Sequence, residues 1–167
     1  MIIRPEREGD QATIRAVTAT AFDGHPHSDG SEPAIIDRLR HAGALSASFV
    51  AEQVGNVIGH VALSPVTIEN GVTGWFGLGP ISVLPEYQGR GIGAALMEKG
   101  LGWLRENGAA GCVLAGNPQF YERFGFRADP LLILKDCAPQ YFLALPLSSA
   151  PASGMVRYHP AFYGGTS

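Results

Sequence analysis

The chain has 167 residues, of which 46% are hydrophobic and 16% are charged, and its formal net charge at pH 7 is −3. This length and composition are typical of one globular domain with one hydrophobic core, so we expect a single domain over residues 1–167. The twelve Lys and Arg residues form no basic stretch with aromatic neighbours, and no window approaches the roughly 20 apolar residues of a membrane span, so neither a nucleic-acid nor a membrane partner is expected.

The N-terminus and the cysteines indicate a cytoplasmic protein without a metal centre. Residues 1–6 lack the basic patch and the long apolar run of a signal peptide. Cys112 lies in the apolar run Gly111–Ala115 and is expected to be a buried strand residue, and Cys137 is not at metal-ligand spacing from it. No group of His, Cys or carboxylate residues has such spacing, so no metal is expected.

The first half of the sequence predicts two helices and four strands. Ile14, Val17 and Phe22 recur on one face of a helix that begins at an Asp10 N-cap. The turn signal Val54–Asn56 separates two strand-like runs, as in a hairpin. The predicted elements are strands over 2–4, 48–53, 57–64 and 72–83, helices over 10–22 and from 35 to about 43, and a loop over 23–33.

The second half opens with the clearest helix of the chain, Gly91–Asn107, whose periodicity rests on Ile92, Leu96 and Trp103. The short apolar run Ala110–Ala115 predicts a buried strand. A short helix over 119–123 and strands from 126, over 131–134 and over 141–145 follow, and a tail of about 148–167 is expected to pack on the domain. Hairpins on both sides of one strand–helix–strand unit predict an α/β fold with a mixed sheet flanked by helices.

The segment Leu78–Leu96 carries the strongest chemical signal. A strand ends near residues 84–85, a loop turns, and a helix begins at about Gly91, with further glycines at 89 and 93. Where glycines replace side chains, a ligand can approach the backbone closely. The first N–H groups of a helix have no internal partner and lie at its positive end, so this loop predicts a pyrophosphate site.

Two other phosphate-binding patterns compete for this loop. The P-loop requires Gly-Lys-Ser/Thr at the start of the helix, and residues 90–93 do not contain it. Gly89-x-Gly91-x-x-Ala94 matches the dinucleotide pattern formally, but that pattern needs an acidic residue about 20 positions further on. The next strand ends at Leu114–Pro118 without an acid, and several strands precede the loop, so the context excludes a nicotinamide dinucleotide.

A third pattern, Gln/Arg-x-x-Gly-x-Gly/Ala, is present as Gln88–Gly93. Here the sequence resembles the GCN5-related N-acetyltransferase (GNAT) family, and Ile81–Leu96 resembles its central acetyl-CoA motif. Asn117–Phe126 resembles the later motif of that family, a Tyr followed by Glu-Arg-x-Gly-Phe, in the right order and about 30 residues on. The closing stretch Tyr158–Phe162 is similar to a bacterial subgroup of predicted acetyltransferases typified by YhbS.

The resemblance implies a GNAT fold with acetyl-CoA as cosubstrate. That fold has a mixed, mostly antiparallel sheet of six or seven strands, about four helices and a splayed central strand pair. Backbone groups of residues 81–83 would pair with the pantetheine arm like an added strand, and an N–H there would polarise the thioester carbonyl. Amides of residues 89–94 would hold the pyrophosphate. The cofactor-binding residues expected on this basis are Ile81, Ser82, Val83, Gln88, Gly89, Arg90, Gly91, Ile92, Gly93, Ala94 and Asn117.

Tyr121 lies in the second motif, where the resemblance implies that it is the general acid for the departing thiolate. A phenol with a pKa near 10 can protonate a coenzyme A thiolate of comparable basicity without being ionised at neutral pH. From composition alone, packing beside Phe120 and Phe124 is the simpler role of this tyrosine, and the motif reverses that preference.

Acetyl transfer requires a neutral amine, so a base or a water relay must remove a proton from the acceptor. Some relatives place a carboxylate on the strand before the cofactor loop, but residues 74–80 contain no ionisable group, and the base is unassigned. His60 on the third strand either faces the cleft or, as the simpler expectation, lies within or beside the core. His25 and His27 lie in the loop between the first two helices, which often shapes the acceptor pocket in this family, and solvation is the simpler role for them. His159 in the tail and a backbone carbonyl with water are the other candidates.

The expected activity is therefore direct transfer of the acetyl group of acetyl-CoA to a primary amine, by a single N-acetyltransferase domain. The acceptor would be a small molecule or a protein, and the resemblance allows a homodimer, since dimers are common in the family. The alternative is a non-catalytic acyl-CoA sensor or interaction module, which the missing base favours. The sequence also leaves open a variant that keeps the fold but transfers an acyl group longer than acetyl.

Overall fold

The computed structural model describes residues 1–164, and a nine-stranded sheet forms its centre. The helices are α1 (Gln11–Phe22), α2 (Glu32–His41), α3 (Ile92–Glu106) and α4 (Pro118–Tyr121). The strands are β1 (Ile2–Pro5), β2 (Ala47–Gln53), β3 (Asn56–Ile68), β4 (Trp75–Val83), β5 (Gly111–Ala115), β6 (Arg127–Ala128), β7 (Leu132–Leu134), β8 (Phe142–Pro146) and β9 (Gly154–Tyr158). No helix within residues 1–164 has the length and apolar character needed to cross a bilayer.

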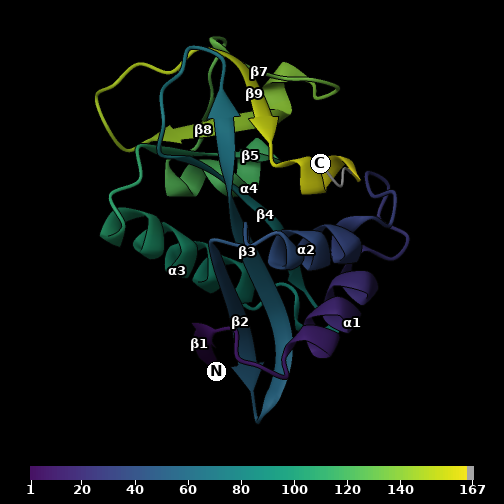
Figure 1. Ribbon diagram of the computed structural model, residues 1–167. Coiled ribbons are helices and arrows are strands. Elements are labelled where there is room, and N and C mark those ends of the chain that lie inside the picture. Colours follow the sequence, from purple (N-terminus) through teal and green to yellow (C-terminus); the bar gives the residue numbers. More distant parts are fainter. Residues whose placement is uncertain (165–167) are drawn as a thin grey trace.

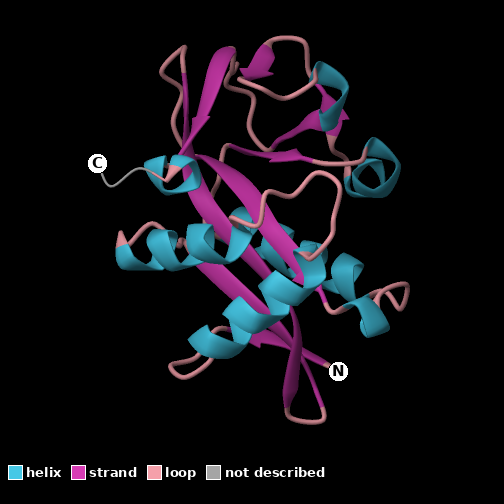
Figure 2. Cartoon of the chain, turned by 90° about the vertical axis from the view of Figure 1, so that its right-hand side faces the viewer, coloured by secondary structure: helices cyan, strands magenta, loops and turns pink. Residues whose placement is uncertain are grey.

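The sheet separates two layers of helices, with α1 and α2 on one face and α3 on the other (Figures 1 and 2). The strand order is β1-β2-β3-β4-β5-β8-β6, and β9 pairs with both the end of β3 and β7. Neighbouring strands are antiparallel except β4 with β5 and β7 with β9, which are parallel. The sheet is therefore mixed and mostly antiparallel, as the sequence predicts.

The largest core cluster lies between the sheet and α3. Ile92, Leu96 and Leu104 recur on the buried face of α3, and Val61 and Leu63 meet them from β3. Each of these side chains is at most 3% exposed, and burying one such side chain stabilises the fold by about 1.5–3 kcal/mol. This packing fixes the direction of α3, and with it the position of the loop that precedes the helix.

Asp10 occupies the expected N-cap position of α1, but its side chain does not cap the helix. Its carboxylate instead accepts hydrogen bonds from Arg4 Nη1 at 2.8 Å and from the backbone N–H of Arg7 at 2.7 Å. Arg4 is only 8% exposed, and a buried guanidinium needs a charged partner more than a helix end needs a cap. The hydrogen bond from Arg4 holds the pKa of Asp10 below its usual value.

Strand β9 lies inside the segment that the sequence predicts as a tail packed on the domain. It pairs with Val66–Ile68, the end of β3, so β3 is longer than predicted. The sheet has nine strands, whereas the resemblance implies six or seven. Gly154–Tyr158 has only one buried residue, Val156, and therefore lacks the apolar alternation that predicts a strand. The last three positions of the predicted tail lie outside the described residues.

Candidate functional site

The open edge of β4 is the first part of the candidate site. β4 pairs with β3 up to Val83, whereas it pairs with β5 only over Trp75–Gly77. Within residues 1–164, residues 78–83 therefore have no strand on their β5 side, and the predicted splay of the central strand pair is confirmed. Free backbone N–H and C=O groups along such an edge can pair with an extended ligand.

The side chains of this edge alternate between the two faces of the sheet. Ile81 and Val83 pack against the cluster on the α3 side. Ser82 lies between them and therefore points to the face that α1 and α2 cover, where it is buried at 5% exposure. The main-chain edge is therefore the part of this segment that a ligand can pair with, since its side chains pack to either side of the sheet.

A glycine-rich loop connects β4 to α3. Its first residues form a short 3₁₀ helix, Pro85–Tyr87, and Gln88 Nε2 donates a hydrogen bond of 3.0 Å to the Val83 carbonyl. The amide of Gln88 therefore fastens the loop to the end of β4. Gly91 is the N-cap residue of α3 with a φ of +83°, and no side chain caps the helix. The first N–H groups of α3 are left free at the positive end of the helix dipole.

The space in front of this helix end is open. A Cβ atom added at Gly89 or Gly91 would meet no heavy atom within 4 Å, and one at Gly93 would meet only Phe120, at 3.7 Å. The guanidinium of Arg90 lies over the Tyr87 ring at 5.4 Å from its centroid. An anion can therefore reach the free amides with an arginine beside them.

Tyr121 and Asn117 lie on the β5 side of the splay, after the end of β5. Asn117 is exposed and caps α4 by accepting a hydrogen bond of 3.0 Å from the Gln119 N–H. Tyr121 packs edge-to-face on Phe120, with ring centroids 4.9 Å apart, and lies against the α3-side cluster. Burial raises the pKa of Tyr121, so the phenol remains protonated at neutral pH.

The family sequence model described as Acetyltransferase (GNAT) domain matches residues 44–128, which contain both the β4 edge and Tyr121. YhbS of Escherichia coli K12, named as an uncharacterized N-acetyltransferase, is 38% identical over 127 residues, which are 75% of this chain and 73% of YhbS. The chain belongs to the GNAT acetyltransferase family.

Two solved GNAT structures resemble the chain over nearly its whole length. An acetyltransferase of the GNAT family from Brucella melitensis, in complex with acetyl-CoA, is 47% identical with a TM-score of 0.86, and the match covers 96% of this chain and 97% of that one. YhbS from Escherichia coli, in complex with CoA, is 31% identical with a TM-score of 0.88, and the match covers 97% and 91% of the two chains. The predicted GNAT fold is confirmed.

The histidines of this GNAT chain occupy different environments. His25 and His27 are exposed in the loop between α1 and α2, as expected. His159 accepts a hydrogen bond of 3.0 Å from the Ala161 N–H through Nδ1 and caps a short 3₁₀ helix. Within residues 1–164, no three His, Cys, Asp or Glu side chains are grouped as metal ligands.

His60 is fully buried on β3 and belongs to a polar network that the sequence does not reveal. Its Nε2 lies 2.7 Å from Ser48 Oγ, and Ser48 Oγ donates to Glu6 at 2.6 Å. Glu6 in turn accepts two hydrogen bonds from Arg40, at 2.8 and 3.0 Å. Glu6 directly follows β1, and its partners lie on β2, α2 and β3, so only the folded chain brings these residues together.

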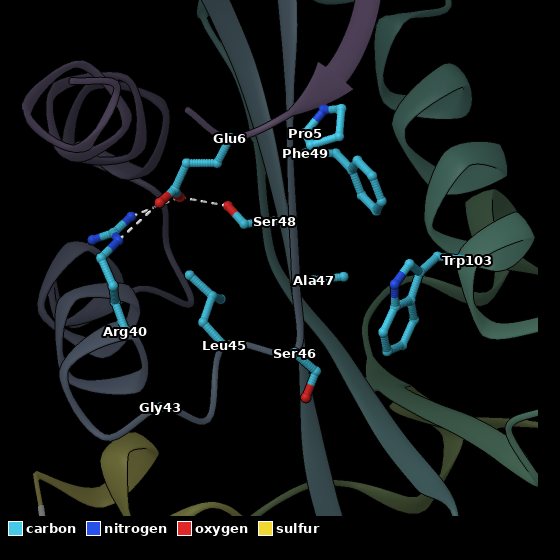
Figure 3. Close-up of a pocket in the computed structure, with 10 residues that line it drawn as sticks. All are labelled: Pro5, Glu6, Arg40, Gly43, Leu45, Ser46, Ala47, Ser48, Phe49 and Trp103. Carbon is cyan, nitrogen blue, oxygen red and sulfur yellow. Dashed lines mark hydrogen bonds and ion pairs between the residues drawn. The ribbon is translucent and has the colours of Figure 1, made fainter. Parts of the chain in front are cut away.

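A pocket of about 440 Å³ opens beside this network, at the end of β1 (Figure 3). Glu6, Arg40 and Ser48 line one side of it, and Phe49 and Trp103 line the α3 side. Figure 3 shows the carboxylate of Glu6 between the guanidinium and the hydroxyl. Water in the pocket can therefore reach the Glu6 end of the network, while the His60 end stays inside the protein.

Proposed function

We propose that the chain transfers the acetyl group of acetyl-CoA directly to a primary amine. The observation that carries the proposal is the unpaired edge of β4, which leads into a helix start with free amides and no side chains in front of it. Membership of the GNAT family and the cofactors bound in the two similar structures support acetyl-CoA as the cosubstrate.

The loop would hold the pyrophosphate. Gln88 fastens the loop to β4, Arg90 lies over the Tyr87 ring, and the space beside Gly89 and Gly91 is open, so the backbone amides of residues 89–94 would bind the phosphates there. A hydrogen bond to a charged group contributes about 1.5–3 kcal/mol, so a few such amides account for a large part of the binding free energy. At Gly89, Gly91 and Gly93 the absence of a side chain leaves room for the phosphates.

The β4 edge would hold the pantetheine arm and the thioester. Backbone groups of Ile81, Ser82 and Val83 would pair with the arm as an added strand, and one of their N–H groups would polarise the thioester carbonyl. Asn117 lies across the splay and would contact the arm from that side. This assignment uses main-chain atoms that lack a strand partner in the described structure.

Tyr121 would protonate the coenzyme A thiolate as it leaves. The phenol is half-buried beside the β5 end of the splay, and its raised pKa keeps the proton available at neutral pH. The acceptor amine would attack the carbonyl carbon while both substrates are bound. The carbon–sulfur bond breaks as the amide bond forms, the thiolate takes the proton of Tyr121, and the tyrosinate takes the proton that the amine nitrogen loses.

The described residues of β4 include no ionisable side chain, and this favours a second candidate, a non-catalytic acyl-CoA sensor. Titration calorimetry with acetyl-CoA, followed by thiol release over a panel of primary amines from polyamines to peptide N-termini, separates the two. Binding with amine-dependent thiol release is expected. Binding without release across the panel would favour the sensor, and absence of binding would contradict both.

A further inference from the structure

Two tyrosine rings lie against glycines at the point where β4 and β5 separate. Gly77 is the last residue of β4 that pairs with β5, and a Cβ atom added there would collide with the ring of Tyr158. Gly116 directly follows β5, and a Cβ atom added there would collide with the ring of Tyr121. Each ring occupies the space that a side chain would otherwise fill, so close packing holds both tyrosines at the base of the splay.

The two rings lie on opposite faces of the sheet. Tyr121 packs against the cluster on the α3 side, to which Leu78 also belongs. Side chains alternate along a strand, so Gly77, one residue before Leu78, faces away from α3, and Tyr158 covers it there. Strand β9 pairs with β3 and β7, so the Tyr158 ring crosses β3 to reach β4.

The acceptor amine has to reach the thioester from the face that Tyr158 occupies. On the proposed assignment, the pantetheine arm pairs with β4 as an added strand, so the plane of the thioester lies along the sheet. A nucleophile attacks a carbonyl carbon from above or below the plane of its substituents. Leu78, Ile81 and Val83 pack on the α3 side of this segment, so the opposite side is the one open to the amine.

The β4 edge is accessible between Tyr158 and α1. Tyr158 covers Gly77 at one end of this stretch, and Ser82 is buried on the α1 and α2 face at the other end. At Gly79, between them, an added Cβ atom would meet no heavy atom within 4 Å. The β3–β4 ladder also shifts register here, and such bulges are common next to active sites. An amine can therefore approach the edge beside the Tyr158 ring.

The Tyr158 hydroxyl is available to a substrate. The ring stacks on Phe162 with centroids 4.8 Å apart, and the backbone N–H of Tyr158 donates a hydrogen bond of 3.2 Å to the Tyr163 hydroxyl. Within residues 1–164, no protein group forms a hydrogen bond with the hydroxyl of Tyr158 itself. Burial raises the pKa of Tyr158, so this hydroxyl stays neutral at pH 7 and acts by hydrogen bonding.

We propose that Tyr158 is an acceptor-binding residue, whose phenol oxygen accepts a hydrogen bond from an N–H of the amine at the splay. This inference rests on the proposed amine transfer. A neutral primary amine has two N–H bonds and one lone pair. When one N–H is donated to Tyr158, the lone pair remains free to point at the carbonyl carbon. The contact holds the nucleophile and moves no proton, so the proposed role of Tyr121 is unchanged.

The first experiment uses Tyr158→Phe, which removes the hydroxyl and keeps the ring over Gly77 and against Phe162. For the amine that gives the fastest thiol release, we expect kcat/KM to fall roughly 3- to 12-fold, mainly through a higher KM, because one neutral hydrogen bond is lost. The acetyl-CoA Kd from titration calorimetry should not change. A kcat/KM within twofold of the wild type for every reactive amine would overturn the proposal.

Tyr163 supplies the matched control, because its hydroxyl accepts the hydrogen bond from the Tyr158 backbone. Tyr163→Phe removes a hydroxyl and loosens the same segment while the phenol of Tyr158 stays intact. It should leave kcat/KM for the amine within twofold of the wild type. Equal losses in Tyr163→Phe and Tyr158→Phe would show that loosened packing, and not the Tyr158 hydroxyl, causes the effect.

Gly77→Ala tests whether the position of the ring matters. The new methyl group would stand where the ring now lies, 2.8 Å from its Cδ1 atom, and would displace the phenol from the splay. The variant should lose at least as much kcat/KM for the amine as Tyr158→Phe. Removing the hydroxyl as well should then add little, because the two changes disrupt one contact. Fully additive losses would show that the two residues act independently and would contradict the proposed contact.

Amine binding to protein saturated with CoA separates the two proposals, since CoA carries no acetyl group to transfer. Weaker amine binding in Tyr158→Phe than in the wild type, without thiol release from acetyl-CoA in either, would support the Tyr158 contact and refute the transfer. Thiol release with equal kcat/KM in both proteins would support the transfer and refute the contact. A panel in which no amine binds or reacts would overturn both.

Discussion

Replacing Gly91 tests the proposed pyrophosphate site most directly. Gly91 has a φ of +83°, and alanine in a left-handed conformation costs about 1–2 kcal/mol, so Gly91→Ala should fold with somewhat reduced stability. For a chain of this size, that cost lowers the melting temperature by about 2–8 °C. The new methyl group would project into the open space before α3, where the phosphate would lie. Losing one charge-assisted amide contact of about 1.5–3 kcal/mol predicts a rise in the acetyl-CoA Kd of roughly 10- to 150-fold.

Gly108 offers a matched control at the other end of the same helix. It has a φ of +66°, and an added Cβ atom there also meets no heavy atom within 4 Å. Gly108→Ala should therefore lose similar stability and bind acetyl-CoA with wild-type affinity. Titration calorimetry gives the Kd, and thermal unfolding gives the stability. Equal affinities of the two variants, or a larger loss of affinity in Gly108→Ala, would refute the pyrophosphate assignment. Gly91→Val, with its bulkier side chain, should abolish binding.

Three further predictions concern other parts of the site. Tyr121→Phe should lower kcat roughly 100-fold or more with an unchanged acetyl-CoA Kd, and equal single-turnover rates would remove Tyr121 from the chemistry. Gln88→Ala removes the hydrogen bond to Val83, so it should lower the free energy of unfolding in urea by about 0.5–1.5 kcal/mol and weaken acetyl-CoA binding. If neither quantity changes, Gln88 does not fasten the loop. His60 has a folded pKa of about 4 against 6.5 unfolded, so the unfolded chain binds more protons between these values and stability falls as the pH drops from 6.5 to 4. The loss should reach about 3 kcal/mol and be absent in His60→Gln, measured by urea unfolding across this range.

The sequence predicts the cofactor-binding part of the site because the residues that indicate it lie within one short segment. The glycines at 89 and 91 stand where the backbone has positive φ, and both lie beside the helix they precede. The apolar periodicity of α3 lies within one continuous segment and locates the start of that helix to within a residue. A motif of this kind can be recognised without knowing the tertiary fold.

The polar network and β9 could not be predicted because distant residues determine them. Glu6 and Ser48 are 42 positions apart, and Ser48 and His60 meet only because β2 and β3 pair in one register. Asp10 follows the same rule, since a partner on β1 overrides its local preference for capping a helix. A lone histidine in an apolar strand correctly predicts burial, but nothing near it in sequence shows which of its nitrogens remains free.

The three-residue contact between β4 and β5 has a consequence for how this scaffold can diversify. On the proposed assignment, main-chain atoms bind the cosubstrate, and every amino acid possesses these atoms. Substitutions along β4 would then leave that recognition intact while altering what each face of the strand presents. Ser82 is the position where the two requirements meet, with its backbone on the cosubstrate edge and its hydroxyl on the α1 side. Exchanging the residue at this position therefore tests whether cosubstrate binding is independent of the side chain that the strand presents.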